Sequence, residues 1–362
     1  MRLKSFEILQ AGARISSVDV FRAFAILPVV IYHFHGYLPY GYLGVDLFFV
    51  ISGLLVGSIL IRQFKRKEKI NFFRFVLQRG FKIWPSYYSF LLIGTIVAYL
   101  FFRDDQPDYV IEGGRSLSRY VFFYQNYDGI PFHWPFAHVW SLCVEEHFYI
   151  LLPIFLIFIM TFLGNNKRFL IISTICFVAA GVFLKLIGEV NSPGIANHTT
   201  THKRMDALGW GVLLAVMTTY HDAKLRVIKW LPLLFFVGAI ILAADIVLSV
   251  YWKNYYFEKI LFSSVVPLCF FLMILGLYYH DFSKWKPLRF VAYYSYNWYL
   301  WHPLFVLLVS KYFGVNALAM AIYIIVSFLV AMLFTILVEE RFLGIREAVL
   351  NKIFKKTIRA AS

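Results

Sequence analysis

Two ionisable residues, Arg22 and His33, lie inside the first apolar run that is long enough to span a bilayer, residues 18–37. A charged side chain in hydrocarbon costs at least ~2.5–3.5 kcal/mol on insertion scales, so such residues are functional candidates by default. Their spacing is close to three helical turns, which places both side chains on one helix face, roughly 16 Å apart along the axis. A guanidinium suits anion binding and an imidazole suits proton transfer. The pair therefore predicts an anion site near one membrane face and a base near the other.

The composition assigns these residues to a membrane protein. The 362 residues are 60% hydrophobic, 20% aromatic and only 15% charged, a balance that excludes a soluble protein of this size. Apolar runs of membrane-spanning length predict an all-α, polytopic fold of about ten transmembrane helices, which form one domain over residues 1–362. The predicted helices cover residues 18–37, 44–61, 83–101, 148–163, 169–187, 206–220, 227–249, 259–280, 291–310 and 317–338.

The positive charge is distributed in a way that sets the orientation. A net charge of +15 would indicate nucleic acid binding in a soluble chain. Here most of the 35 Lys and Arg fall in alternate loops, above all in residues 62–82 (RQFKRKEKINFFRFVLQRGFK). The positive-inside rule then places these loops and both termini in the cytoplasm. The charge indicates topology and contact with membrane lipid headgroups, and no nucleic acid partner is predicted.

This orientation sorts the remaining polar candidates by depth. The first helix runs outward, so Arg22 lies in its inner half and His33 in its outer half. Besides His33, the predicted outer layer contains Asp46, Glu145, Glu146, Arg204 and Asp206, with His302 somewhat deeper. The predicted inner layer contains Arg22, together with Arg79 and Lys82 at the mouth of the third helix. The division predicts an anionic ligand that arrives from the cytoplasm and proton chemistry toward the opposite side.

An acyl transfer reaction would use these groups in definite roles. Moving an acetyl group from a thioester to an alcohol requires a base for the hydroxyl proton, and imidazole has a reference pKa of about 6.5. His33 is the candidate base. A carboxylate can hold the other ring nitrogen and stabilise the imidazolium. Glu145 and Glu146 are ranked ahead of Asp46 for this role.

The phosphates of a coenzyme A donor would require fixed cations. Arg22 with Arg79 or Lys82 fits this requirement, since a guanidinium stays charged and binds phosphate through two parallel hydrogen bonds. The pantetheine arm is long and thin and can reach from these cations to His33. In the outer layer, Asp46, Arg204, Asp206 and His302 are candidates for binding the acceptor.

Each candidate also has a structural interpretation. Arg22 can extend its side chain to the inner interface, and the two histidines can be hydrogen-bonded or packed between helices. Arg204 and Asp206 can form an ion pair with each other. Asp46 and one of the two glutamates can stand at helix starts without further function. The pattern alone leaves these alternatives open.

The ordered motifs resemble those of the acyltransferase 3 family of bacterial integral-membrane O-acyltransferases, over nearly the whole chain. The motifs are RAFAILPVVIYH (Arg22 to His33), GVDLFFVISG, RGFKIWPSYY, WSLCVEEHFY, RMDALGWG, SYNWYLWHP and VEERF. The resemblance implies about ten helices, a cytoplasmic acyl-CoA donor and a glycan or other hydroxylated acceptor, and it ties activity to Arg22 and His33. Many relatives carry a C-terminal hydrolase-like domain. This chain ends soon after the tenth helix, which indicates a stand-alone form.

Together these observations predict an O-acyltransferase of the bacterial inner membrane. It would transfer an acyl group, expected to be acetyl from acetyl-CoA, to a cell-surface or secreted polysaccharide or its lipid-linked precursor. No metal is expected, because the three cysteines lack metal-ligand spacing. The alternative is a proton-coupled transporter or flippase in which buried His, Arg and Glu form a proton relay. The missing inverted repeat and the scarcity of charges in the late helices disfavour that alternative.

Overall fold

The computed structural model describes residues 15–102, 113–127, 134–191, 199–252 and 254–360. Within these ranges all regular secondary structure is helical, which confirms the predicted all-α fold. The α-helices are α2 (Ser16–His33), α3 (Gly44–Lys65), α4 (Phe72–Phe102), α5 (Gly113–Val121), α6 (Trp140–Phe158), α7 (Lys167–Asn191), α8 (Met205–Tyr220), α9 (Asp222–Arg226), α10 (Leu233–Tyr251), α11 (Ser263–Leu277), α12 (Lys286–Phe313), α13 (Ala317–Phe334) and α14 (Glu340–Ala360).

The helices that match the predicted spans form a polytopic bundle. In the described part of the chain, eight helical segments are long and apolar enough to cross a membrane, and α8 is a shorter apolar helix. The ninth predicted span corresponds to α12, whose apolar character is lowered by polar residues that face the interior. Ser295, Asn297 and His302 of α12 are fully buried. The prediction of about ten membrane helices is therefore confirmed at the level of a multi-pass, all-α protein.

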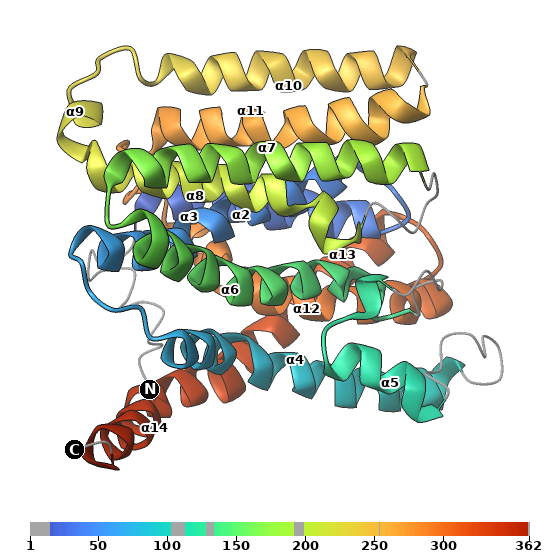
Figure 1. Cartoon of the computed structure of the whole chain (residues 1–362). Helices are drawn as coiled ribbons and strands as arrows, with labels where there is room; N and C mark the ends of the chain where they lie inside the picture. The colour runs from blue at the N-terminus through green and yellow to red at the C-terminus, as the bar shows by residue number, and fades with distance from the viewer. Residues whose placement is uncertain (1–14, 103–112, 128–133, 192–198, 253, 361–362) are drawn as a thin grey trace.

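The centre of the bundle is built around close contact between α3 and α8. Gly53 of α3 and Gly211 of α8 meet here, and a Cβ added to Gly53 would lie 2.1 Å from the carbonyl oxygen of Leu208. Small residues of this kind let two membrane helices approach each other's backbone. Figure 1 shows α10 at one edge of the bundle, beside α11, and most of its surface is exposed. The polar residues predicted to be functional lie on α2, α3, α4, α6, α8 and α12, except Arg204, which directly precedes α8.

The two ends of the bundle carry different elements. The start of α2 lies beside the connection between α11 and α12, because Ser17 Oγ donates to the Tyr278 carbonyl oxygen at 2.8 Å. The start of α14 adjoins α12 at the same end, where Tyr293 Oη donates to Glu340 at 2.7 Å. We call this the α14 end, and the opposite end, with α5, the α5 end (Figure 1). The predicted cytoplasmic termini include residues 1–14 and 361–362, which lie outside the described residues.

The two largest shifts between predicted and observed helix starts are in α4 and α6, which both begin earlier than the apolar pattern predicts. The fourth predicted span starts at residue 148, but α6 starts at Trp140, and α4 starts at Phe72 rather than at residue 83. At the start of α6 the polar residues Ser141 and Glu146 are buried against protein, which hydropathy alone cannot detect. As a consequence, Lys82 lies well inside α4, and Glu145 lies within α6 rather than before its first residue.

Candidate active site

Two cavities approach each other in the middle of the bundle. The large cavity, of about 840 Å³, opens toward the α5 end and includes His33, Asp46 and Arg204 in its wall. The small cavity, of about 150 Å³, lies toward the α14 end and includes the three predicted cations of the inner layer and Glu145. Only two of the described residues, Val45 and Tyr299, line both cavities. Arg22, Arg79 and Lys82 therefore line a different cavity from His33, as expected from their predicted positions along the helices.

His33 is the last residue of α2, and a backbone carbonyl fixes its imidazole. Nδ1 lies 2.8 Å from the carbonyl oxygen of Val29. A carbonyl oxygen can only accept, so Nδ1 carries the proton and Nε2 keeps its lone pair. His302 is fully buried with its ring centroid 4.9 Å from that of His33, and its Nδ1 is held at 3.0 Å by the Trp298 carbonyl oxygen. Its Nε2 has no hydrogen-bond partner among the described residues. The two imidazoles thus present the same unprotonated nitrogen.

Neither predicted glutamate is paired with His33. Glu145 lines the small cavity and accepts a 2.6 Å hydrogen bond from Tyr149 Oη. Glu146 is buried and accepts from Trp84 Nε1 at 3.1 Å. The orienting role that the sequence assigned to a carboxylate is filled by the Val29 carbonyl. Both glutamates lie inside α6, which starts at Trp140, and their partners Tyr149 and Trp84 come from α6 and α4 rather than from α2.

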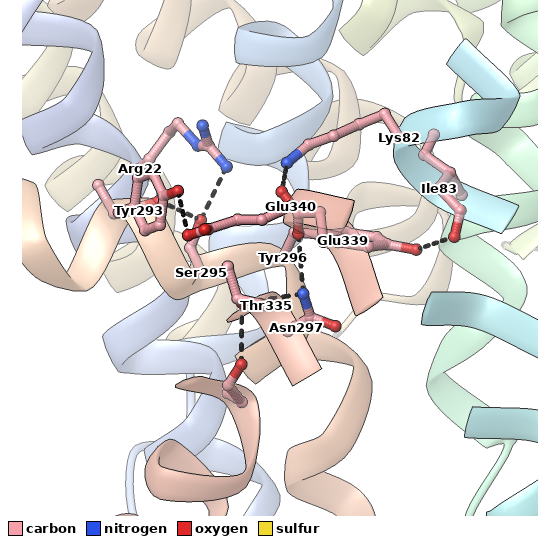
Figure 2. Close-up of polar contacts among 12 residues, drawn as sticks. Arg22, Lys82, Ile83, Tyr293, Ser295, Tyr296, Asn297, Thr335, Glu339 and Glu340 are labelled. Carbon is pink, nitrogen blue, oxygen red and sulfur yellow. Dashed lines mark hydrogen bonds and ion pairs between the residues drawn. The ribbon is translucent and has the colours of Figure 1, made fainter. Parts of the chain in front are cut away.

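The small cavity gathers the three basic residues predicted to bind the donor. Arg22 Nη2 donates to Ser295 Oγ at 3.0 Å, and Lys82 forms an ion pair with Glu339 (Figure 2). The Arg79 guanidinium lies 5.8 Å from the centre of the Phe75 ring, and its Nε is buried without a hydrogen-bond partner in the described structure. Three cations from α2 and α4 therefore line one narrow space beside Glu145.

The polar residues of the large cavity are organised as separate ion pairs. Arg204 donates to Asp46 at 2.9 Å, with its guanidinium 5.4 Å from the Trp140 ring centre. Asp206 is paired with Lys185 at 2.7 Å, and both side chains are at most 2% exposed. The sequence left open an ion pair between Arg204 and Asp206. That interpretation is wrong, because each residue is paired with another partner. Lys185 was not among the predicted site residues, although it is the one charged residue in the predicted span over residues 169–187.

The comparisons with known proteins decide the family. A family model described as an acyltransferase domain matches residues 15–339. The chain belongs to this acyltransferase family. The match confirms the resemblance found in the motifs, and it covers every cavity residue named above. No solved structure matches the chain.

Relatives within the family carry more specific names. The O-acetyltransferase OatA of Staphylococcus aureus is 25% identical over 350 residues, which cover 91% of this chain and 57% of that protein. The peptidoglycan O-acetyltransferase OatA of Listeria monocytogenes is 25% identical over 302 residues, with 80% of this chain and 49% of the relative covered. The chain thus spans about half the length of these curated relatives.

A third histidine in the acyltransferase domain was not singled out from the sequence. His138 is 3% exposed, and its ring centroid lies 5.5 Å from that of His302. Its Nε2 donates to the Leu300 carbonyl oxygen at 3.1 Å. His138 follows an irregular aromatic segment (FHWPFA), so no helical period indicated which way it points. We call His33, His138 and His302 the histidine cluster.

Glu339, in the VEERF motif of the family resemblance, is a further buried acidic residue that was not among the predicted site residues. It directly follows the last predicted span, residues 317–338, yet its side chain is only 5% exposed. It ends a π-helical turn, Thr335–Glu339, and accepts from Asn297 Nδ2 at 2.8 Å as well as from Lys82. Such π turns often mark functional sites in helices. The SYNWYLWHP motif contains the residues that bind these side chains. Ser295 contacts Arg22 and Asn297 contacts Glu339 (Figure 2).

Proposed function

We propose that the chain is an O-acetyltransferase of the bacterial inner membrane. It transfers an acetyl group from cytoplasmic acetyl-CoA to a hydroxyl of a cell-surface glycan or its lipid-linked precursor. The observation that carries the proposal is the pair of adjoining cavities, with Arg22, Arg79 and Lys82 in the wall of one and His33 in the wall of the other. Membership of an acyltransferase family and relatives named as peptidoglycan O-acetyltransferases support the reaction type and the class of acceptor.

The small cavity is suited to the reactive arm of the donor. Arg22, Arg79 and Lys82 supply positive charge for phosphates, and the two arginines can bind them through paired hydrogen bonds. The cavity volume of about 150 Å³ is below the usual 300–1,000 Å³ of a small-molecule site. It therefore accommodates the pantetheine arm rather than the whole donor. The nucleotide would remain near the basic α14 end.

The large cavity is suited to a glycan acceptor. Its volume of about 840 Å³ lies in the range of small-molecule sites, and the aromatic side chains in its wall offer flat apolar surfaces to sugar rings. The Arg204–Asp46 pair supplies both a hydrogen-bond donor and an acceptor for sugar hydroxyls. Lys185 extends this polar wall and is held in place by Asp206. The aromatic residues of the wall include Tyr32, Tyr40, Tyr42 and Trp140.

His33 acts as the general base in this reaction. Its Nε2 takes the proton of the acceptor hydroxyl while the hydroxyl oxygen attacks the thioester carbonyl carbon. The carbon–sulfur bond then breaks, and the thiolate of coenzyme A leaves and takes up the proton from the imidazolium. The Val29 carbonyl holds Nδ1–H throughout and stabilises the positive ring. His302 lines neither cavity, and its fully buried ring packs against the ring of His33, so it supports the base rather than the acceptor.

The decisive experiment is a turnover assay on the purified protein in lipid nanodiscs. Acetyl-CoA and glycan fragments are supplied, free thiol is measured over time, and the glycan is analysed by mass spectrometry. We expect thiol release that depends on the acceptor and gives an acetylated glycan in equal amount. Acetyl-CoA left intact with every glycan tested, together with proton-driven movement of a solute across proteoliposomes, would favour the transporter alternative.

A further inference from the structure

Two of the described residues line both cavities and therefore lie between them, and we call this place the partition. Val45 lies in the first turn of α3 and is 8% exposed, and Tyr299 lies in the middle of α12 and is 7% exposed. Both residues line the large cavity on one side and the small cavity on the other. A group that passes directly from one cavity to the other therefore meets these two side chains.

Hydrogen bonds on both sides of the partition hold the Tyr299 ring in place. Its hydroxyl donates to the His138 carbonyl oxygen at 2.9 Å and shares a 2.7 Å hydrogen bond with Ser141 Oγ. His138 lines the large cavity and Ser141 lines the small one, so the phenol is anchored to both walls. Val45 has a stiff, β-branched side chain in a helix. The partition is a rigid constriction rather than a flexible loop.

The positions of the reacting groups require the thioester to reach this constriction. The cations that would hold the donor line only the small cavity, and His33 lines only the large one. The thioester carbon must be within reach of a hydroxyl that contacts His33, so the acyl group itself enters the space between Val45 and Tyr299. The carbons of the acyl chain beyond the thioester carbonyl must then also fit between Val45 and Tyr299.

We infer that Val45 and Tyr299 form an acyl-length filter, which admits an acetyl group and rejects longer acyl chains. The inference rests on the proposed function and specifies its donor. Discrimination of one methylene in a hydrophobic pocket typically amounts to about 10–200-fold in kcat/KM. A rigid constriction places this discrimination at the two residues, rather than in the walls of either cavity.

The test compares acetyl-, propionyl- and butyryl-CoA as donors for three matched valine-to-alanine variants. Val45→Ala opens the partition, Val56→Ala enlarges the small cavity only, and Val266→Ala enlarges the large cavity only. We expect Val45→Ala to raise the butyryl-to-acetyl ratio of kcat/KM by about 10-fold or more. The two control variants should keep the wild-type ratio.

A second variant enlarges the side chain at position 45, so the filter can still be tested if Val45→Ala does not fold. Val45→Ile adds one methylene to the partition, so it should lower the butyryl-to-acetyl ratio while coenzyme A still binds in the small cavity. An unchanged ratio in a folded, active Val45→Ala protein, or an equal shift in all three alanine variants, would overturn the filter. Failure of the wild-type protein to transfer acetyl groups would instead refute the proposed function, so the two failures are distinguishable.

Discussion

The hydrogen bond at Nδ1 of His33 decides which ring nitrogen can take a proton. The Val29 carbonyl binds Nδ1–H, and Nε2 keeps the lone pair that a base requires. We therefore expect His33→Ala to lower kcat by about 10²–10⁴-fold, the usual contribution of a general base. Thiol release from acetyl-CoA in the presence of a glycan measures the effect.

The matched control is His35→Ala. His35 is only two residues away, but it is exposed, bonded to Ser310 at 2.8 Å, and does not line either cavity. It should keep nearly wild-type turnover. If a well-expressed His33→Ala protein retained more than about a tenth of the activity, His33 would not be the base.

Arg22 gives a second prediction at the scale of one residue. Its guanidinium is held at 3.0 Å by Ser295 Oγ in the wall of the small cavity. We expect Arg22→Ala to weaken the binding of a non-hydrolysable coenzyme A analogue, and Arg22→Lys to recover only part of it, because an ammonium lacks the planar fork. A binding isotherm measures both. Arg226→Ala serves as control, since Arg226 is exposed and paired with Asp222. Unchanged affinity in Arg22→Ala would leave Arg22 a structural role.

At the scale of elements, one short segment of α12 organises the small cavity. Ser295 contacts Arg22 of α2, and Asn297 contacts Glu339, which in turn pairs with Lys82 of α4 (Figure 2). Between them, Tyr296 Oη donates to the Ile83 carbonyl oxygen at 2.8 Å. Three consecutive residues thereby connect α12 to α2, to α4 and to the π turn before α14.

The Lys82–Glu339 pair carries a stability prediction. Glu339 is 5% exposed, so Lys82→Met leaves a carboxylate in the interior without its cation. We expect a loss of ~3 kcal/mol, the lower end of the range for breaking a buried pair, because Lys82 is itself 32% exposed. Thermal unfolding in detergent should show a lower midpoint for Lys82→Met.

The double variant Lys82→Met/Glu339→Gln tests the cause of this loss. It removes both charges, so most of the lost stability should return if the unpaired carboxylate is the reason. The exposed pair Arg226–Asp222 is the control, and Arg226→Met should change the midpoint little. A double variant less stable than either single one would contradict the interpretation.

The elements also show how far the sequence alone could predict this molecule. Long apolar runs identified the membrane helices, because a run of about twenty apolar residues matches the thickness of the hydrocarbon core. The distance between two residues along one helix was also predictable from their spacing. Arg22 and His33 are about three turns apart on α2, and they line different cavities. The neighbours of Glu145 could not be predicted, because other helices bury the polar start of α6 and hydropathy does not report contacts between helices. The partners of Arg204 and Asp206 depended on α3 and α7, which no pattern within one helix reveals.

At the scale of the whole molecule, the two cavities open toward opposite ends of the bundle. The large cavity lies toward the α5 end and the small cavity toward the α14 end, with the constriction of Val45 and Tyr299 between them. If the α14 end is cytoplasmic, as the positive-inside rule predicts, the donor and the acceptor approach from opposite sides of the membrane. The acetyl group then crosses part of the bilayer inside the protein.

Sidedness is the last prediction, because the proposed route of the acetyl group depends on it. Lys67 is exposed in the connection between α3 and α4 at the α14 end, and Val315 is 51% exposed between α12 and α13 at the α5 end. Single cysteines at these positions, in a protein without Cys143, Cys176 and Cys269, are treated with a membrane-impermeant thiol reagent on intact cells. We expect labelling of Val315→Cys but not of Lys67→Cys, and labelling of both after the membrane is permeabilised. The reverse pattern would turn the large cavity and His33 toward the cytoplasm, where donor and acceptor would meet on one side and no transmembrane route would be needed.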